Sequence, residues 1–355
     1  MRKVSIYILL ILIIFVLSGC ENTPDSSAVF SPGPTIEAEV TPGFSPDINN
    51  EASPTPIADR EIDFKDPNFE VVIRKALGKS IGDILVSDVQ RITSLTARVC
   101  GILYVDELKY FTSLEYLDLY GNRINDLTPL SYLTTLKELN LSKNYNVLYS
   151  QGREGFDISP LKGLINLEKL DLQDNMIIDI SALSSMVHLK ELNLSNNKIT
   201  DLSVMSACIS LLYVDLSGNT ELETMSPIYT LQNIKKIMAN NCNLKTLDGI
   251  SQVNTLQHLE VNHNKLESIS PVCFMTDLGY IDASNNYISD ISYLSGDISI
   301  KTLNISYNLI SDFNVIMNMH ALKNITWVGN PVKDYTPIDT FENKEGTEIE
   351  NEPIN

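Results

Sequence analysis

One repeat of 22 residues constrains this sequence more than any other feature. Each copy begins with an aliphatic residue, defined as position 0, and further aliphatic residues stand at positions 3, 5, 10, 13, 16 and 19. Eleven copies follow one another, the last of them truncated, and they begin at Ile92, Leu114, Leu136, Leu167, Leu189, Leu211, Ile234, Leu256, Leu278, Ile300 and Leu322. A length of 355 residues ordinarily suggests two or three globular domains, but self-similarity at a fixed period predicts a single stacked array over residues 92–339.

Each turn of the array combines a short strand with a polar ladder residue. Position 3 is expected to point inward and positions 2 and 4 outward, and stacked turns form a parallel sheet with a continuous core behind it. Position 8 is expected to satisfy buried backbone groups at the bend after the strand. The predicted ladder consists of Cys100, Asn122, Asn144, Asn175, Asn197, Asn219, Cys242, Asn264, Asn286, Asn308 and Asn330. Nine extra residues between Tyr145 and Asp157 predict a protruding loop.

The pattern resembles the leucine-rich repeat. Segments such as 122–130, with Asn122, Ile124, Leu127 and Leu130, are similar to the bacterial internalin type. The resemblance implies an α/β-class, right-handed superhelical solenoid with the parallel sheet on its concave face and short helical or 3-10 turns on its convex face. It also implies a helical N-terminal cap and a binding role.

The segments that flank the repeats have compositions of their own. Asp66-Pro67 is a helix-start signal and Gly78 ends the apolar run that follows, so residues 61–91 are expected to form a helical cap. A second short helix is expected over residues 87–91, with Ser87 as its N-cap. Residues 340–355 contain five Glu and one Lys without periodicity, which predicts a disordered acidic tail.

The N-terminus carries an export signal. Residues 1–19 combine a basic start with an apolar run from Val4 to Leu17, which is shorter than the roughly 20 residues that span a bilayer. The sequence Leu17-Ser18-Gly19-Cys20 resembles the bacterial lipobox, and the resemblance implies cleavage before Cys20 and lipidation of that residue. Residues 20–60 are rich in Pro, Ser and Thr and are expected to be a disordered tether. We therefore expect an extracytoplasmic protein held at the membrane or cell surface by a lipid anchor.

Charge and motif content exclude several classes of function. The formal net charge of −19 argues against nucleic acid as a partner, because phosphate attracts a basic surface. The sequence contains no Gly-rich phosphate loop, no nucleophile elbow and no zinc-protease motif. Carboxylates on an open sheet face are expected to stay in water, without the desolvation that raises a pKa for acid catalysis. We expect no enzymatic activity, no metal and no other cofactor.

The outward strand positions supply the candidate binding residues. Tyrosines and carboxylates recur at positions 2, 4 and 6, and tyrosine offers a large amphipathic contact area with few rotamers to order. The candidate ligand-binding residues are Tyr116, Asp118, Tyr120, Asp171, Tyr213, Asp215, His258, Glu260, Tyr280 and Asp282. A solvated polar face that only keeps the sheet soluble would show the same composition.

Three functions are open for the chain, two of them on this face. The first is recognition of a protein partner, whose basic patch the acidic surface would steer. The second is binding of cell-wall or other glycans by stacking on tyrosine, which the presence of a single tryptophan, Trp327, weakens. The third is catalysis by groups of the 145–157 insertion such as Glu154, which no spacing signal supports. We adopt the first: a cell-surface protein that binds a protein partner through its concave face.

Overall fold

The computed structural model describes residues 59–145, 155–295 and 299–342. The chain divides into two units between Glu61 and Ile62, and the repeats lie in the second. The signal peptide, Cys20, nearly all of the tether, the centre of the 145–157 insertion and most of the acidic tail fall outside the described residues.

A helical cap precedes the first repeat, as predicted. Helix α2 (Pro67–Leu77) begins at the N-cap Asp66 and ends at Gly78, whose φ of 62° is left-handed. One carboxylate oxygen of Asp66 accepts hydrogen bonds from the N–H groups of Asn68 and Phe69, and the other accepts from Leu103 and Tyr104 of the first turn. One buried side chain therefore joins the cap to the repeats.

The second helix of the cap begins earlier than predicted. Helix α3 spans Val86–Val89, and its N-cap residue is Leu85. The expectation that Ser87 caps this helix is wrong, because Ser87 lies inside it. Asp88 instead accepts a hydrogen bond from the Leu85 N–H at 2.9 Å, so the carboxylate of the first turn satisfies the end of the helix.

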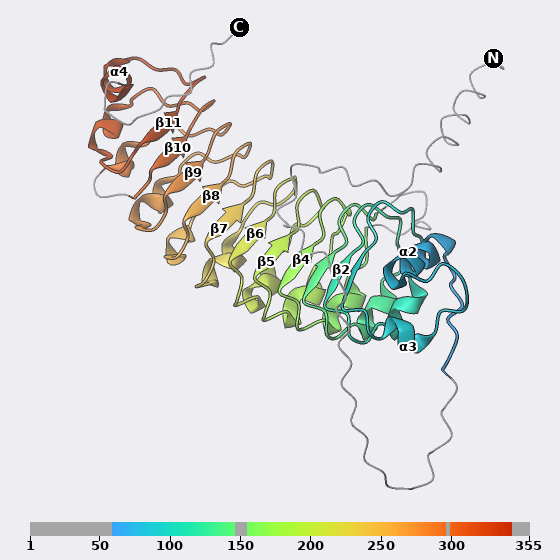
Figure 1. The fold of residues 1–355 in the computed structure, drawn as a ribbon. Coiled ribbons are helices and arrows are strands. Elements are labelled where there is room, and N and C mark those ends of the chain that lie inside the picture. Colours follow the sequence, from blue (N-terminus) through green and yellow to red (C-terminus); the bar gives the residue numbers. More distant parts are fainter. Residues whose placement is uncertain (1–58, 146–154, 296–298, 343–355) are drawn as a thin grey trace, which may run out of the picture. The chain divides into compact units, whose positions relative to one another are not determined.

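Eleven parallel strands form one sheet in sequence order (Figure 1). Each strand occupies positions 2 to 4 of its turn, and each pairs in register with the same positions of the next turn, as Leu117 does with Leu139. The strands are β1 (Ser94–Thr96), β2 (Tyr116–Asp118), β3 (Glu138–Asn140), β4 (Lys169–Asp171), β5 (Glu191–Asn193), β6 (Tyr213–Asp215), β7 (Lys236–Met238), β8 (His258–Glu260), β9 (Tyr280–Asp282), β10 (Thr302–Asn304) and β11 (Asn324–Thr326).

Short 3-10 helices stack on the other side of the core. They are η1 (Asp106–Tyr110), η2 (Thr128–Tyr132), η3 (Ser159–Gly163), η4 (Ser181–Ser185), η5 (Ser203–Ala207), η6 (Ser226–Thr230), η7 (Ile250–Gln252), η8 (Ser270–Phe274), η9 (Ser292–Leu294) and η10 (Asn314–Asn318). Between the two layers, the aliphatic residues of the repeat are almost completely buried, Leu117 and Leu130 among them. Because the core runs unbroken from turn to turn, each turn is stabilised mainly by its neighbours.

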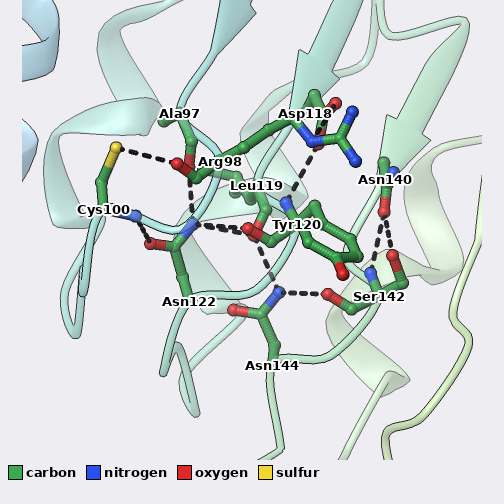
Figure 2. Close-up of polar contacts among 10 residues, drawn as sticks. All are labelled: Ala97, Arg98, Cys100, Asp118, Leu119, Tyr120, Asn122, Asn140, Ser142 and Asn144. Atoms are coloured by element: carbon green, nitrogen blue, oxygen red, sulfur yellow. Dashed lines mark hydrogen bonds and ion pairs between the residues drawn. The ribbon is translucent and has the colours of Figure 1, made fainter. Parts of the chain in front are cut away.

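The position-8 side chains link consecutive turns (Figure 2). Asn122 Oδ1 accepts hydrogen bonds from the N–H groups of Cys100 and Ile102, both at 3.1 Å. Its Nδ2 donates to the carbonyl oxygens of Ala97 at 2.6 Å and Leu119 at 2.8 Å. The Asn residues of the following turns repeat this arrangement with small variations, so each amide satisfies backbone groups of two turns at once.

Position 7 is left-handed in every turn, a constraint that the sequence analysis missed. All eleven residues there have φ between 52° and 79°. They are Val99, Gly121, Lys143, Asp174, Asn196, Gly218, Asn241, His263, Asn285, Tyr307 and Gly329. Three Gly and three Asn at this position were the available signal, because those residues tolerate positive φ best.

A short helix covers the last turn and corrects the predicted tail. Helix α4 spans Thr336–Glu342 and packs against η10, with Ile338 and Phe341 each 1% exposed. Disorder from residue 340 onward is therefore wrong for Thr340 to Glu342. Two apolar side chains spaced three residues apart are enough to cover the end of the core, although the segment is acidic and without a long period.

Replacing a ladder asparagine should destabilise the whole array. The Asn197 Oδ1 accepts hydrogen bonds from the buried N–H groups of Asn175 and Ile177, so Asn197→Ala leaves these two donors unsatisfied. The Leu172 and Leu194 carbonyls lose the bonds from Asn197 Nδ2 but keep those from Asn175 and Asn219. We expect a loss of about 3 kcal/mol or more in the free energy of unfolding, measured by urea denaturation. Asn197→Cys should lose less, because Cys242 fills the same position natively and its thiol donates to the Leu216 carbonyl at 3.4 Å. Equal losses for the two variants would contradict the role assigned to the amide.

Relieving the strain at Val99 should stabilise the fold. A β-branched residue at φ 53° is unfavourable, and the Val99 side chain is 64% exposed and therefore contributes little to the core. We expect Val99→Asn to raise the free energy of unfolding by about 1 kcal/mol. The reverse exchange at the same position of another turn, Asn241→Val, should lower it by a similar amount. Urea denaturation of both variants checks the pair, and a gain with Asn241→Val would contradict the explanation.

Candidate functional site

The outward face of the sheet consists of positions 2, 4 and 6 of the eleven turns. Position 2 is half-buried in every strand, because neighbouring side chains of a parallel sheet stand about 4.8 Å apart and cover one another. Position 4 divides the sheet into two parts. Its side chain is buried in β2, β3, β4 and β6, and it is half-buried from β7 to β11.

Position 4 has a structural role that explains its burial. Asp118 Oδ1 accepts a hydrogen bond from the N–H of Tyr120 at 3.0 Å, and Asp171 and Asp215 accept equivalent bonds from the residues two positions later. Asn140 and Asn193 do the same in the turns between them. Asp or Asn at this position therefore bends the chain out of the strand, as an Asx turn does. The sequence analysis missed this role, because the recurrence of tyrosines and carboxylates on the outward face does not show which of them bond to the backbone.

Burial changes the electrostatics of these carboxylates. Asp171 is 5% exposed, and desolvation raises its pKa to about 7, with the Asp118 and Asp215 carboxylates contributing in the same direction. Desolvation also raises the pKa values of Asp118 and Asp215 above the usual range. The expectation that an open sheet leaves these groups in water is therefore wrong, because the position-2 rows and the strand-end bend remove them from solvent.

The repeat rule breaks at β7 and β8. Position 4 is Met238 in β7 and Glu260 in β8, neither of which forms the short side-chain bond to the residue two positions later. Position 6, most often Ser, becomes Asn240 and Asn262 in these turns. The N–H of Asn240 donates to Ser217 Oγ and the N–H of Asn262 donates to Asn240 Oδ1, both at 3.1 Å. Hydrogen bonds between turns thus replace the local bend.

The same two asparagines hold the carboxylates of the neighbouring strands. Asn240 Nδ2 donates to Glu260 Oε2 at 3.0 Å, and Asn262 Nδ2 donates to Asp282 Oδ2 at 3.1 Å. Glu260 is thereby fixed on the outward face without a bond to its own strand end, whereas Asp282 Oδ1 still accepts the Ser284 N–H at 3.0 Å.

Glu260 is the centre of the resulting cluster. Its Oε1 lies 2.6 Å from His258 Nε2 and 3.3 Å from Lys236 Nζ. The hydrogen bond with His258 lowers the pKa of Glu260 to about 2, with further contributions from Asn240 and Lys236. The His258 ring stacks on Tyr280, with the ring centroids 4.0 Å apart and the planes at 5°. Two charges and two rings are therefore held in one arrangement.

Tyr213 extends this cluster to β6. Its hydroxyl donates to the sulfur of Met238 at 3.1 Å, and Lys236 Nζ lies 5.8 Å from its ring centroid. Burial raises the pKa of the Tyr213 hydroxyl, with Asp215 and Glu260 adding to the effect. We name the cluster the β6–β9 platform, and it consists of Tyr213, Lys236, Met238, His258, Glu260, Tyr280 and Asp282.

The candidate residues of the sequence analysis form two groups rather than one. Tyr213, His258, Glu260, Tyr280 and Asp282 belong to the β6–β9 platform, which also includes Lys236 and Met238, two residues that the sequence analysis did not select. Asp171 and Asp215 are buried between the groups.

The second group lies on β1 and β2 (Figure 2). Arg98 lies over the Tyr120 ring at 4.6 Å and 3.7 Å from Asp118. Tyr116 is half-buried and close enough to interact with Asp118 and Arg98. One carboxylate oxygen of Asp118 accepts the Tyr120 N–H, and the other lies beside Arg98.

Metal-binding side chains are dispersed over the array. In the described parts of the chain, no group of three or more His, Cys, Asp or Glu side chains is placed to hold a metal ion. Within the described ranges, Cys100, Cys208, Cys242 and Cys273 form no disulfide. No helix among the residues that the structure describes is long and apolar enough to cross a membrane.

Comparison with known proteins agrees with this geometry. A family model of two leucine-rich repeat copies matches residues 165–207 and 187–230, and a single leucine-rich repeat model matches residues 113–133. The fold is a leucine-rich repeat solenoid. Its predicted class is therefore confirmed, with eleven parallel strands on one face and 3-10 helices on the other. No curated protein matches the chain.

Solved structures with this fold include internalins. An internalin InlF from Listeria monocytogenes is 23% identical, and the match covers 82% of this chain and 96% of that one with a TM-score of 0.58. An internalin C2 from the same organism is 26% identical over 62% of this chain and 94% of its own, also with a TM-score of 0.58. A plant peptide hormone receptor, RGFR1 in complex with RGF2, is 21% identical over 70% and 41%, with a TM-score of 0.57.

Protonation of Asp171 should make stability depend on pH. Its pKa of about 7 in the folded state exceeds the usual 3.8, so the folded state binds the proton more tightly and loses stability as pH rises from about 4 through 7. We expect Asp171→Asn to be more stable than wild type at pH 8 by on the order of 2 kcal/mol and nearly equal to it at pH 4, because Asn fits this position in the adjacent turns. Asn193→Asp should shift stability the opposite way at pH 8. Urea denaturation at both pH values tests this, and an Asp171→Asn variant that is less stable at pH 8 would contradict it.

Proposed function

We propose that this chain is a lipid-anchored, extracytoplasmic protein that binds a protein partner through the outward face of its sheet and performs no chemistry itself. The observation that carries the proposal is the β6–β9 platform. In a repeat protein, the positions where the structural rule is abandoned are candidates for function, since stability alone favours keeping the rule. Here Met238 and Glu260 replace the Asp or Asn that every turn from β2 to β6 uses.

The platform has the composition and rigidity of a recognition surface. Tyr213 and Tyr280 offer large contact areas, and their ring positions are set by Met238 and His258. A partner therefore meets side chains that are already ordered, which lowers the entropic cost of binding. Aromatic groups beside charged groups are typical of the residues that dominate protein interfaces.

Charge favours a partner with a basic patch. The cations of the outward face are each paired with a carboxylate: Arg98 with Asp118, Lys169 with Glu191 and Lys236 with Glu260. Acidic residues outnumber cations there, so the face keeps a negative potential after internal pairing. Such a potential accelerates association with a basic surface and weakens with added salt.

The placement outside the cytoplasm rests on the N-terminal sequence. A lipidated Cys20 and a Pro-rich tether over residues 20–60 would hold the repeats away from the membrane, with the sheet face available to soluble or surface proteins. The internalin likeness and the peptide complex of the RGFR1 solenoid support a protein or peptide ligand rather than a small substrate.

The test compares platform tyrosines with a tyrosine elsewhere on the array. Proteins retained from surface extracts by residues 21–355 are identified, purified and titrated against Tyr213→Ala/Tyr280→Ala and against Tyr132→Ala, whose side chain is 60% exposed on η2. We expect the double variant to weaken binding at least tenfold and Tyr132→Ala to leave it unchanged. Equal affinity of both variants, or retention of purified cell-wall glycan in place of any protein, would overturn the proposal. Urea denaturation of each variant controls for folding.

A further inference from the structure

A second surface lies on the flank of the solenoid, where each 3-10 helix returns to the next strand. The residue two places before each new turn is polar and exposed in most of the described array, as in Thr112, Thr134, Gln232 and Thr276. In three consecutive turns it is aliphatic and still exposed: the exposed fractions are 48% for Ile165, 37% for Val187 and 59% for Ile209. Leu212, three residues after Ile209, is 40% exposed. We name these four residues the apolar strip.

The fold does not require aliphatic residues in the strip. The N–H groups of Ile165, Val187 and Ile209 bond to the carbonyl two residues earlier at 2.9, 3.1 and 2.9 Å. Thr112 makes the same bond at 3.0 Å with a polar side chain. Threonine therefore allows the same backbone hydrogen bond. Three neighbouring aliphatic side chains exposed to water lower solubility, and such a patch is typical of a surface that another molecule covers.

Alternating charges run beside the strip. Position 1 of successive turns is Glu115, Lys137, Glu168 and Lys190, followed by Leu212 and Lys235. Glu115 pairs with Lys137 at 2.8 Å and Glu168 pairs with Lys190 at 2.6 Å. A shallow hollow of about 430 Å³ lies along this row, lined by Glu115, Thr135, Lys137, Asn166, Glu168 and His188.

This order of charges is complementary to itself. A two-fold axis between the turns that begin at Leu167 and Leu189 reverses the row on a second copy. Glu168 then meets Lys190 of the second copy, and Glu115 meets its Lys235. Ile165 meets Val187 of the second copy at the axis, and Ile209 and Leu212 face the turn that carries its Thr134 and Lys137. Opposite charges face each other at every charged pair that the axis creates, which is the condition for an isologous interface.

We propose that this flank is the interface of a homodimer. The occupant of the apolar strip is a second copy of this chain, selected by the self-complementary charge row. The contact spans the turns from Glu115 to Lys235, a length of about 24 Å at one strand spacing per turn, so it belongs to the small class of interfaces and dissociates in the micromolar range.

The dimer is independent of the proposed function. The strip and the charge row lie at the flank, and the β6–β9 platform lies on the outward face, so pairing leaves both platforms uncovered. When one platform of the dimer has bound a partner with repeated sites, the second platform is held close to the next site. The dimer would therefore bind such a partner more tightly than a monomer does.

The experiment is sedimentation velocity on residues 21–355 from about 1 to 200 µM. We expect the mass to rise from monomer to dimer over this range and the apparent association to weaken at high salt. Val187→Glu and Ile165→Glu should each weaken association at least tenfold, since each places a carboxylate in the apolar contact at the axis. Thr276→Glu puts the same side chain at the same exposed position outside the proposed interface and should leave association unchanged.

A charge reversal separates this arrangement from nonspecific apolar contact. Glu168→Lys should weaken the dimer, because the introduced ammonium group would face Lys190 of the second copy, and Glu168→Lys/Lys190→Glu should restore it. A monomer at every concentration would overturn the proposal. It would equally be overturned by a dimer that tolerates Val187→Glu and Ile165→Glu, or by one that the double reversal fails to restore. Because the platform is untouched in all these variants, loss of partner binding in the earlier test remains a separate result.

Discussion

The hydrogen bonds between successive turns are the interaction on which the rest of this molecule depends. A single 22-residue turn has one apolar side and several backbone groups at the bend that no partner within the turn can reach. Asn122 shows the solution, since one amide accepts from two N–H groups of the preceding turn and donates to carbonyls of both turns. The net value of each bond is modest, but a buried donor or acceptor without a partner is costly. Nine asparagines and two thiols at this position therefore maintain one continuous core.

The need to satisfy backbone groups also determines the residues of the sheet surface. Asp118, Asp171 and Asp215 look like a row of ligand-binding acids, and each is first a strand-end residue that accepts a backbone hydrogen bond. Holding a carboxylate there costs desolvation, which raises its pKa, whereas Asn in the alternate turns avoids the cost. The acid retained at this position gives the surface its negative potential at the expense of some stability near neutral pH.

Departures from the repeat mark the surfaces with a separate purpose. At β7 and β8 the bend residue is replaced by Met238 and Glu260, and hydrogen bonds between turns, made by Asn240 and Asn262, take the place of the local bonds. On the flank, three consecutive turns have an exposed aliphatic residue where most of the other turns have a polar one. At β7 and β8 other hydrogen bonds compensate for the changed residues. On the flank the backbone bonds form equally well with a polar residue, so the fold does not require the aliphatic ones. These two departures are the basis of the two binding surfaces that we propose.

The sequence by itself determined the architecture of the solenoid. The period, the inward positions, the ladder residues and the start and end of α2 all follow from local spacing, because each turn contacts only its neighbours and every contact recurs at a fixed interval. Ser87 and the α4 helix show where such reasoning fails: both lie beyond the repeats, and their structure depends on contacts that occur once. The site required the tertiary structure for a related reason. Burial of Asp171, the stacking of His258 on Tyr280 and the exposure of Ile209 depend on what covers each side chain across neighbouring turns, and that cover is a property of the packed array rather than of any one segment.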